Sequence, residues 1–136
     1  MSVTGKAPVA TLGAVLGSLL LLAVPADIRA GNLLAEVQDL RVELVSEPDR
    51  PFRNKETIYT LRLRDSSGAT VNGAKPTLAG RMADGMTVLT PLRPTGEAGV
   101  YTGRVLFTME GAWQITLRVS YQGKTLELPL AEEVRR

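Results

Sequence analysis

The chain has 136 residues, and 44% of them are apolar, which is enough for one folded domain with a packed core. It contains no cysteine and no histidine. These absences exclude disulfides, zinc–thiolate sites and thiol nucleophiles, and they remove the commonest general base, so we expect no enzymatic activity. The net charge is +2, from 16 basic and 14 acidic residues without a basic run, and only 4% of residues are aromatic. Nucleic-acid binding is therefore not expected, and no small-molecule substrate is inferred.

The N-terminal region has the pattern of an export segment. Residues 7–26 carry no charge and follow Lys6. A helix of this length spans about 30 Å, the thickness of a bilayer core, and Lys6 favours an N-terminus on the cytoplasmic side. Residues 24–26 also fit a signal-peptide cleavage site. We expect residues 1–30 to be a signal peptide or membrane anchor with a short linker. Residues 31–136 then form an extracytoplasmic domain on the periplasmic side, which is anchored in the inner membrane or secreted.

The region after residue 30 shows the period-two alternation of half-buried strands. Residues 31–39 are expected to form a linker or a partly helical spacer, and the C-terminal residues 130–136 a frayed polar tail. The expected strands are residues 40–45, 57–64, 75–80 and 86–92, followed by three consecutive strands within residues 99–128 that are separated by turns at Glu110-Gly111 and Gln122-Gly123. About seven strands with regularly spaced turn signals predict an all-β, immunoglobulin-like antiparallel β-sandwich, preceded by the N-terminal hydrophobic helix. A small barrel is the alternative.

The alternation also predicts which side chains form the core. One face of the strand that starts at Val105 continues through Phe107 to Met109, so Met109 is expected to face inward. The expected core residues are Tyr59, Leu61, Leu63, Phe107, Trp113, Ile115 and Leu117. Trp113 is the natural anchor, because burying a large aromatic side chain contributes several kcal/mol.

Three sequence blocks resemble the YtkA-like domain family, which includes the FixH-like proteins. They are LRLRDSSGATVNGAKPTL (residues 61–78), GRMADGMTVLTPL (residues 80–92) and GVYTGRVLFTMEGAWQITLRV (residues 99–119). The resemblance implies an exported or membrane-anchored immunoglobulin-like β-sandwich without catalytic activity. It also implies an association with copper handling and with the assembly of respiratory oxidases.

The resemblance further implies a set of candidate copper ligands. Carried over by position, these are Met82 and Met86 in the second block, with Met109 from the third block. The chain departs from metal-binding family members because it has no histidine. Thioether sulfur is a soft ligand that suits Cu(I), so Cu(I) is the candidate cofactor. Packing is the favoured interpretation of these methionines, since methionine fills irregular gaps in a core, and a weak Cu(I) site is the alternative.

Two functional hypotheses follow. In the first, the chain is a non-catalytic accessory protein with a membrane-protein partner, acting in the assembly of a respiratory or other membrane complex or in copper handling. In the second, it is a purely structural subunit or protein-interaction module of a membrane or envelope assembly, without metal. Convergence of the three methionine sulfur atoms would favour the metal version of the first hypothesis. A retained anchor and an exposed apolar patch on one sheet would favour the second.

Overall fold

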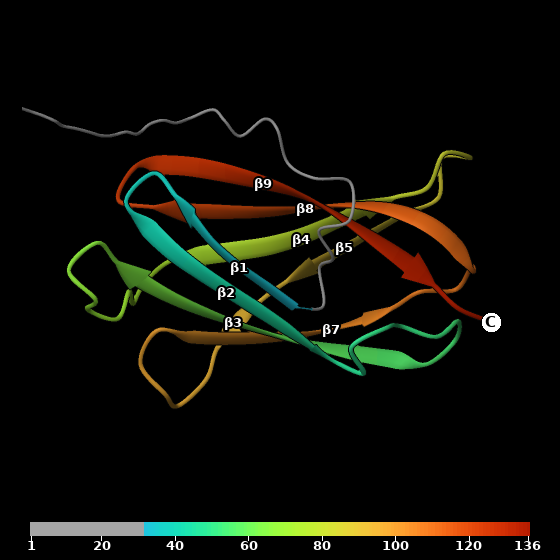
Figure 1. Cartoon of the computed structure of the whole chain (residues 1–136), viewed down its shortest axis with the longest axis horizontal. Coiled ribbons are helices and arrows are strands. Elements are labelled where there is room, and N and C mark those ends of the chain that lie inside the picture. The colour runs from blue at the N-terminus through green and yellow to red at the C-terminus, as the bar shows by residue number, and fades with distance from the viewer. Residues whose placement is uncertain (1–31) are drawn as a thin grey trace, which may run out of the picture.

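The computed structural model describes residues 32–136, so the expected N-terminal helix lies outside the described residues. Regular structure in the described range is entirely β (Figure 1). In chain order the nine strands within residues 32–136 are β1 (Asn32–Val37), β2 (Leu40–Glu47), β3 (Glu56–Asp65), β4 (Lys75–Arg81), β5 (Thr87–Pro91), β6 (Arg93–Pro94), β7 (Val100–Leu106), β8 (Gly111–Tyr121) and β9 (Lys124–Val134). This part of the chain holds no helix that is long and apolar enough to cross a membrane.

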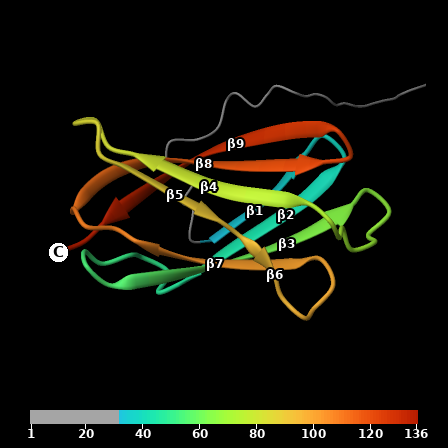
Figure 2. The ribbon, with the colours of Figure 1, turned by 180° about the vertical axis from the view of Figure 1, so that it is seen from behind.

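The strands form two antiparallel sheets that pack face to face (Figure 1 and Figure 2). One sheet has the order β1-β2-β3-β7-β6, and the other has the order β5-β4-β8-β9. The predicted immunoglobulin-like sandwich is therefore confirmed. The structure adds strands that the sequence patterns did not predict, because β1 and the two-residue β6 lie in segments without clear alternation.

The core lies between the two sheets and contains all seven residues named above as expected core residues, whereas Met109 lies outside it. Tyr59, Leu61, Leu63, Phe107 and Leu117 are fully buried, and Trp113 and Ile115 are at most 3% exposed. Trp113 and Phe107 meet edge to face, with ring centroids 5.2 Å apart and an interplanar angle of 64°. This arrangement is the favoured one for an aromatic pair, so the two rings hold β8 against the end of β7.

Two segments that were expected to be irregular are strands. Residues 32–37 are not a spacer but strand β1, which pairs with β2 over six positions and buries Leu33 against the core. Residues 130–134 are not a frayed tail but the end of β9, because Leu130 and Val134 alternate inward as the residues before them do. The backbone N–H of Arg135 then donates to the carbonyl of Pro51 at 2.9 Å. This contact, with the parallel bridge between Phe52 and Arg135, ties the end of β9 to the loop between β2 and β3.

Among the described strands, β9 is one of the two edges of its sheet, and it carries a proline at its centre. Pro129 pairs with Thr116 of β8 and is exposed, while its neighbours Leu128 and Leu130 point into the core. A proline has no backbone N–H, so it is tolerated where its nitrogen faces the open side of an edge strand.

The passage from one sheet to the other depends on a glycine. After β5 the chain crosses at Leu92 to join the other sheet as β6, and the N–H of Leu92 donates to the carbonyl of Pro76 at 2.9 Å. Beneath this crossing lies Gly103 of β7, where a Cβ atom would stand 2.5 Å from Leu92 Cδ2 and 3.1 Å from the Pro91 carbonyl oxygen. A side chain at this position would crowd the crossing, so glycine allows the close approach of the two backbones.

A buried tyrosine holds the loop between β3 and β4. The Tyr101 hydroxyl donates to the carbonyl of Val71 at 2.8 Å and accepts from the N–H of Ala74 at 3.2 Å. Nearby, the N–H of Gly99 donates to Asn72 Oδ1 at 2.8 Å. The Gly-x-Tyr element of the third sequence block thus has a structural role, because it fastens this loop to the start of β7.

Candidate functional site

The candidate methionines lie on two loops at one end of the sandwich. The β4–β5 hairpin turns through residues 82–86, and the connection from β7 to β8 covers residues 107–110. Both loops are at the end of the molecule where the C-terminus lies, as two opposite views show (Figure 1 and Figure 2). The structure therefore brings Met82, Met86 and Met109 to the same end of the domain.

Met82 and Met86 are cross-strand neighbours. The N–H of Met82 donates to the carbonyl of Met86 at 2.9 Å, and Gly85, with φ of +97°, closes the turn between them. The register of β4 with β5 places Arg81 opposite Thr87, so the next pair is Met82 opposite Met86. Directly opposed residues project from the same face of a sheet with Cβ atoms about 5 Å apart. Two thioether side chains consequently start side by side on the inner face of the hairpin.

The Met82 side chain contacts the residue that follows the β7–β8 connection, whereas Met109 does not face inward as the alternation predicted. A Cβ atom on Gly111 would stand 3.1 Å from Met82 Cε, so the Met82 side chain lies against the start of β8. Met109 precedes Gly111 by two residues and is 40% exposed. The prediction of an inward-facing Met109 was wrong, because β7 ends at Leu106 and period two does not continue through a loop.

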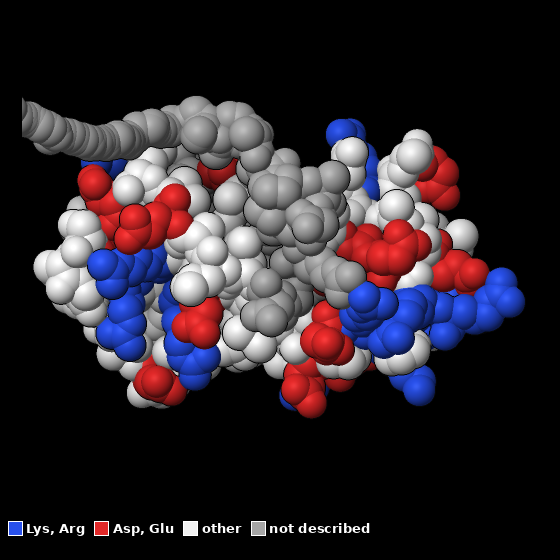
Figure 3. Space-filling view, viewed as in Figure 1, with Lys and Arg blue, Asp and Glu red and all other residues white. Residues whose placement is uncertain are grey.

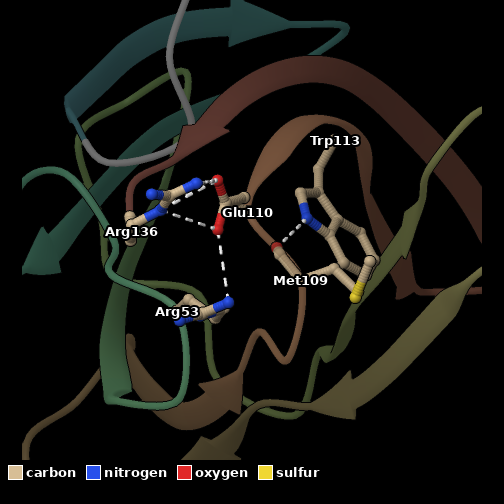
Figure 4. A network of polar contacts seen from close by, with 5 residues as sticks. All are labelled: Arg53, Met109, Glu110, Trp113 and Arg136. Carbon is tan, nitrogen blue, oxygen red and sulfur yellow. Dashed lines mark hydrogen bonds and ion pairs between the residues drawn. The ribbon is translucent and has the colours of Figure 1, made fainter.

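Trp113 fixes the position of Met109. The indole Nε1–H donates to the Met109 carbonyl at 3.0 Å, and the Met109 side chain lies beside the indole ring (Figure 4). Trp113 itself is 1% exposed and is packed close to Gly80 of β4, where a Cβ atom would stand 3.4 Å from the ring. The loop that carries Met109 is thus held by a rigid aromatic side chain.

The donors available at this end suit a soft ion. Within residues 32–136 no group of three or more histidine, cysteine, aspartate or glutamate side chains could hold a metal ion. Met82 is half-buried at the edge of the core, and Met86 is 38% exposed. Thioether sulfur prefers Cu(I) to harder divalent ions. By donor type alone, these thioethers suit Cu(I) and not Zn²⁺ or Ca²⁺.

An ion-pair network stands beside the methionines. Glu110 lies between Arg53 at 3.3 Å and Arg136 at 3.1 Å (Figure 4). Hydrogen bonds from the Arg136 guanidinium, together with the charges of Arg136 and Arg53, lower the pKa of the Glu110 carboxyl. Because all three side chains are at least 36% exposed, the network contributes little stability but orients the loop. Basic and acidic side chains are interspersed at both ends of the visible face (Figure 3).

A buried polar pair that the sequence analysis missed joins the two sheets. The Tyr59 hydroxyl of β3 donates to Glu132 Oε2 of β9 at 3.1 Å, and Glu132 is 3% exposed. Burial, followed by the charge of Glu132 and the hydrogen bond to it, raises the pKa of Tyr59 far above its ordinary value. The sequence pattern could have revealed this pair, because Glu132 stands at the alternate position between Leu130 and Val134, which both face the core.

The family can now be stated from comparison with known proteins. The YtkA-like family model matches residues 34–118, more than half of the chain. The chain belongs to the YtkA-like family. The match confirms the YtkA-like part of the resemblance and does not extend to the FixH-like proteins. A comparison with curated proteins found no match to this YtkA-like chain.

Two solved structures share the sandwich of this YtkA-like domain. The Lin-41 filamin domain has a TM-score of 0.55 and 23% sequence identity, with 70% of this chain and 92% of that chain covered. A DUF4426 family protein from Pseudomonas aeruginosa has a TM-score of 0.60 and 12% identity, with coverage of 77% and 95%. At these identities the likeness concerns the fold alone.

Proposed function

We propose that this YtkA-like chain is a non-catalytic accessory protein at the outer face of the cytoplasmic membrane, where it binds Cu(I) and supports the assembly of a membrane protein complex. The uncharged run at residues 7–26, of the length of a bilayer core, supports the location. Family membership supports the accessory role. In this role the domain binds Cu(I) as a transported ion and then passes it on.

One observation carries the metal part of the proposal. The Met82 side chain touches the start of β8 two residues after Met109, although Met82 lies on the β4–β5 hairpin and Met109 on the connection between the two sheets. Together with the Met82–Met86 pairing, this contact supports a site made of two or three thioethers. These sulfur atoms would hold Cu(I), and the indole ring beside Met109 would exclude water from one side of the ion.

A competition titration tests the metal site. The reduced full chain is titrated with Cu(I) against a competing chelator, beside a Met82→Leu, Met86→Leu double variant. We expect the variant to bind at least about tenfold more weakly. Thioethers carry no titrating proton, so the affinity should be nearly constant between about pH 5 and pH 8. Equal binding by both proteins, or binding by neither, would assign these methionines to packing.

Export and anchoring are tested separately. We expect the chain in the membrane fraction with residues 7–26 retained, because this run is long enough to cross the bilayer. N-terminal sequencing of a soluble mature protein that starts at Asp27 or Gly31 would refute anchoring and leave only export.

An exposed apolar side chain favours the second candidate function, a protein-interaction module without metal. Leu89 of β5 is 70% exposed and stands at the rim of a hollow on the outer face of the four-stranded sheet. Failure of the Cu(I) titration together with recovery of a membrane-protein partner would select this candidate over the copper-binding one.

A further inference from the structure

The outer face of the four-stranded sheet has a hollow that the methionine site does not use. The hollow has a volume of about 350 Å³ and is bounded by β4, β5 and β8, which Figure 2 shows from the side of β5. A row of residues in register, Leu89, Ala79 and Thr116, crosses its centre. Ala79 and Thr116 are small and half-buried, so they leave a depression beside the exposed Leu89.

The charged side chains that line the hollow are all basic. Arg81 and Arg118 stand at its border, and none of the lining residues is acidic. Arg118 pairs with Glu127 at 2.8 Å, but both side chains are at least half exposed, so this pair is weak and exchangeable. No ion pair is formed by Arg81 within residues 32–136. The hollow therefore offers two guanidinium groups to an acidic ligand.

The spacing of the two arginines defines the shape of that ligand. In the register of β4 with β8, Arg81 lies opposite Gln114, and Arg118 lies opposite Thr77, so the two are four residues apart along the strands. At about 3.3 Å per residue this separation is about 13 Å. The apolar row with Ala79 lies midway between them. An extended peptide has the same period, since its residues i, i+2 and i+4 point to one side.

We propose that this hollow binds an extended segment of a partner protein that has carboxylates at positions i and i+4 and a small apolar side chain at i+2. Each carboxylate would accept hydrogen bonds from one guanidinium group. The apolar side chain would enter the depression over Ala79 and contact Leu89. The inference deepens the proposed function, because it names the chemistry of the partner, but it does not depend on copper.

Peptide binding tests this inference directly. The full chain in mild detergent is titrated into a fluorescein-labelled peptide, Ser-Glu-Ser-Val-Ser-Glu-Ser, and anisotropy is recorded. A peptide of identical composition, Ser-Ser-Glu-Val-Glu-Ser-Ser, brings the carboxylates to i and i+2. We expect the first peptide to bind at least about fivefold more tightly, and the difference to shrink as salt is raised.

Matched variants locate the binding on the outer sheet face. Arg81→Gln with Arg118→Gln should weaken binding of the first peptide about tenfold, because both charge-assisted contacts are lost. The control variant Arg41→Gln with Arg104→Gln removes two positive charges from the other sheet. It breaks two ion pairs, whereas the first double variant breaks one, and it should leave peptide binding unchanged. Leu89→Ser should weaken binding without affecting folding, since its side chain is largely in solvent.

Several results would overturn the inference. Equal affinity for the two peptides would show that only net charge matters. Equal losses in the two double-arginine variants would place the binding elsewhere, and self-association that is abolished by Leu89→Ser would identify a second copy of this chain as the occupant. No binding of the first peptide at millimolar protein would also refute the inference. A negative peptide result with a positive Cu(I) titration would leave the proposed function intact.

Discussion

Replacing Trp113 by alanine is the most direct test of the core at the methionine end of the sandwich. The side chain is 1% exposed, meets Phe107 edge to face, and donates to the Met109 carbonyl. Deleting a buried aromatic side chain of this size costs about 3–5 kcal/mol through lost burial and the cavity left behind. Since small domains are stable by about 5–15 kcal/mol, the variant should still fold at low temperature but with a large shift in its unfolding midpoint.

A second variant divides this loss into parts. Trp113→Phe keeps an aromatic ring against Phe107 but removes the Nε1–H donor, whose partner on Met109 lies near solvent and can bind water. We therefore expect a smaller loss, of about 1–2 kcal/mol. Urea unfolding followed by far-UV circular dichroism measures both variants without relying on tryptophan fluorescence. A loss below about 1 kcal/mol for Trp113→Ala would refute the packing described for this end of the core.

Three further predictions concern residues other than the three candidate methionines. Thr57→Val should raise the free energy of unfolding by about 1 kcal/mol, because the Thr57 hydroxyl is fully buried without a hydrogen-bond partner within the described residues. A decrease in the free energy of unfolding would show that the hydroxyl has a partner. Gly103→Ala should lower the free energy of unfolding by about 1–3 kcal/mol through overpacking under the sheet crossing, while Gly96→Ala, in open space, serves as the neutral control. The pKa of the Glu110 carboxyl is lowered in the folded state, so its charged form stabilises the fold at pH values above the ordinary carboxyl pKa. This stabilisation is lost as the pH falls through the lowered pKa of Glu110. The free energy of unfolding, measured at pH 7 and at about pH 3, should therefore fall less on acidification for Glu110→Gln than for the natural chain. An identical fall for both proteins would mean that the network with Arg136 is not formed in solution.

The fold was largely predictable because its strands bury one face each. Strict alternation from Trp113 to Val119 and from Tyr59 to Leu63 marked the core strands, and each of these side chains is buried. Strand β1 escaped prediction because Leu33 points inward while the adjacent Leu34 is 80% exposed, so the pair of leucines hides the period. Its strand state comes from pairing with β2, which no local pattern encodes.

The candidate site was predictable only in part. Family resemblance identified the three methionines, and the sequence could show that Met82 and Met86 share a hairpin. It could not show that Met82 reaches Gly111, because that contact depends on how the β4–β5 hairpin meets the β7–β8 connection at the end of the sandwich. The hollow between Arg81 and Arg118 was equally hidden, since it arises from the register between β4 and β8.

The proline at the centre of β9 has a consequence for the behaviour of many copies of the domain together. An eleven-residue edge strand would otherwise present a long row of unpaired backbone groups to the edge of another molecule. Pro129 removes one donor from the middle of that row, and the exposed carboxylates of Glu127 and Glu133 add charge repulsion between like edges. The β9 edge of one copy is therefore disfavoured as a template for strand pairing with the β9 edge of another.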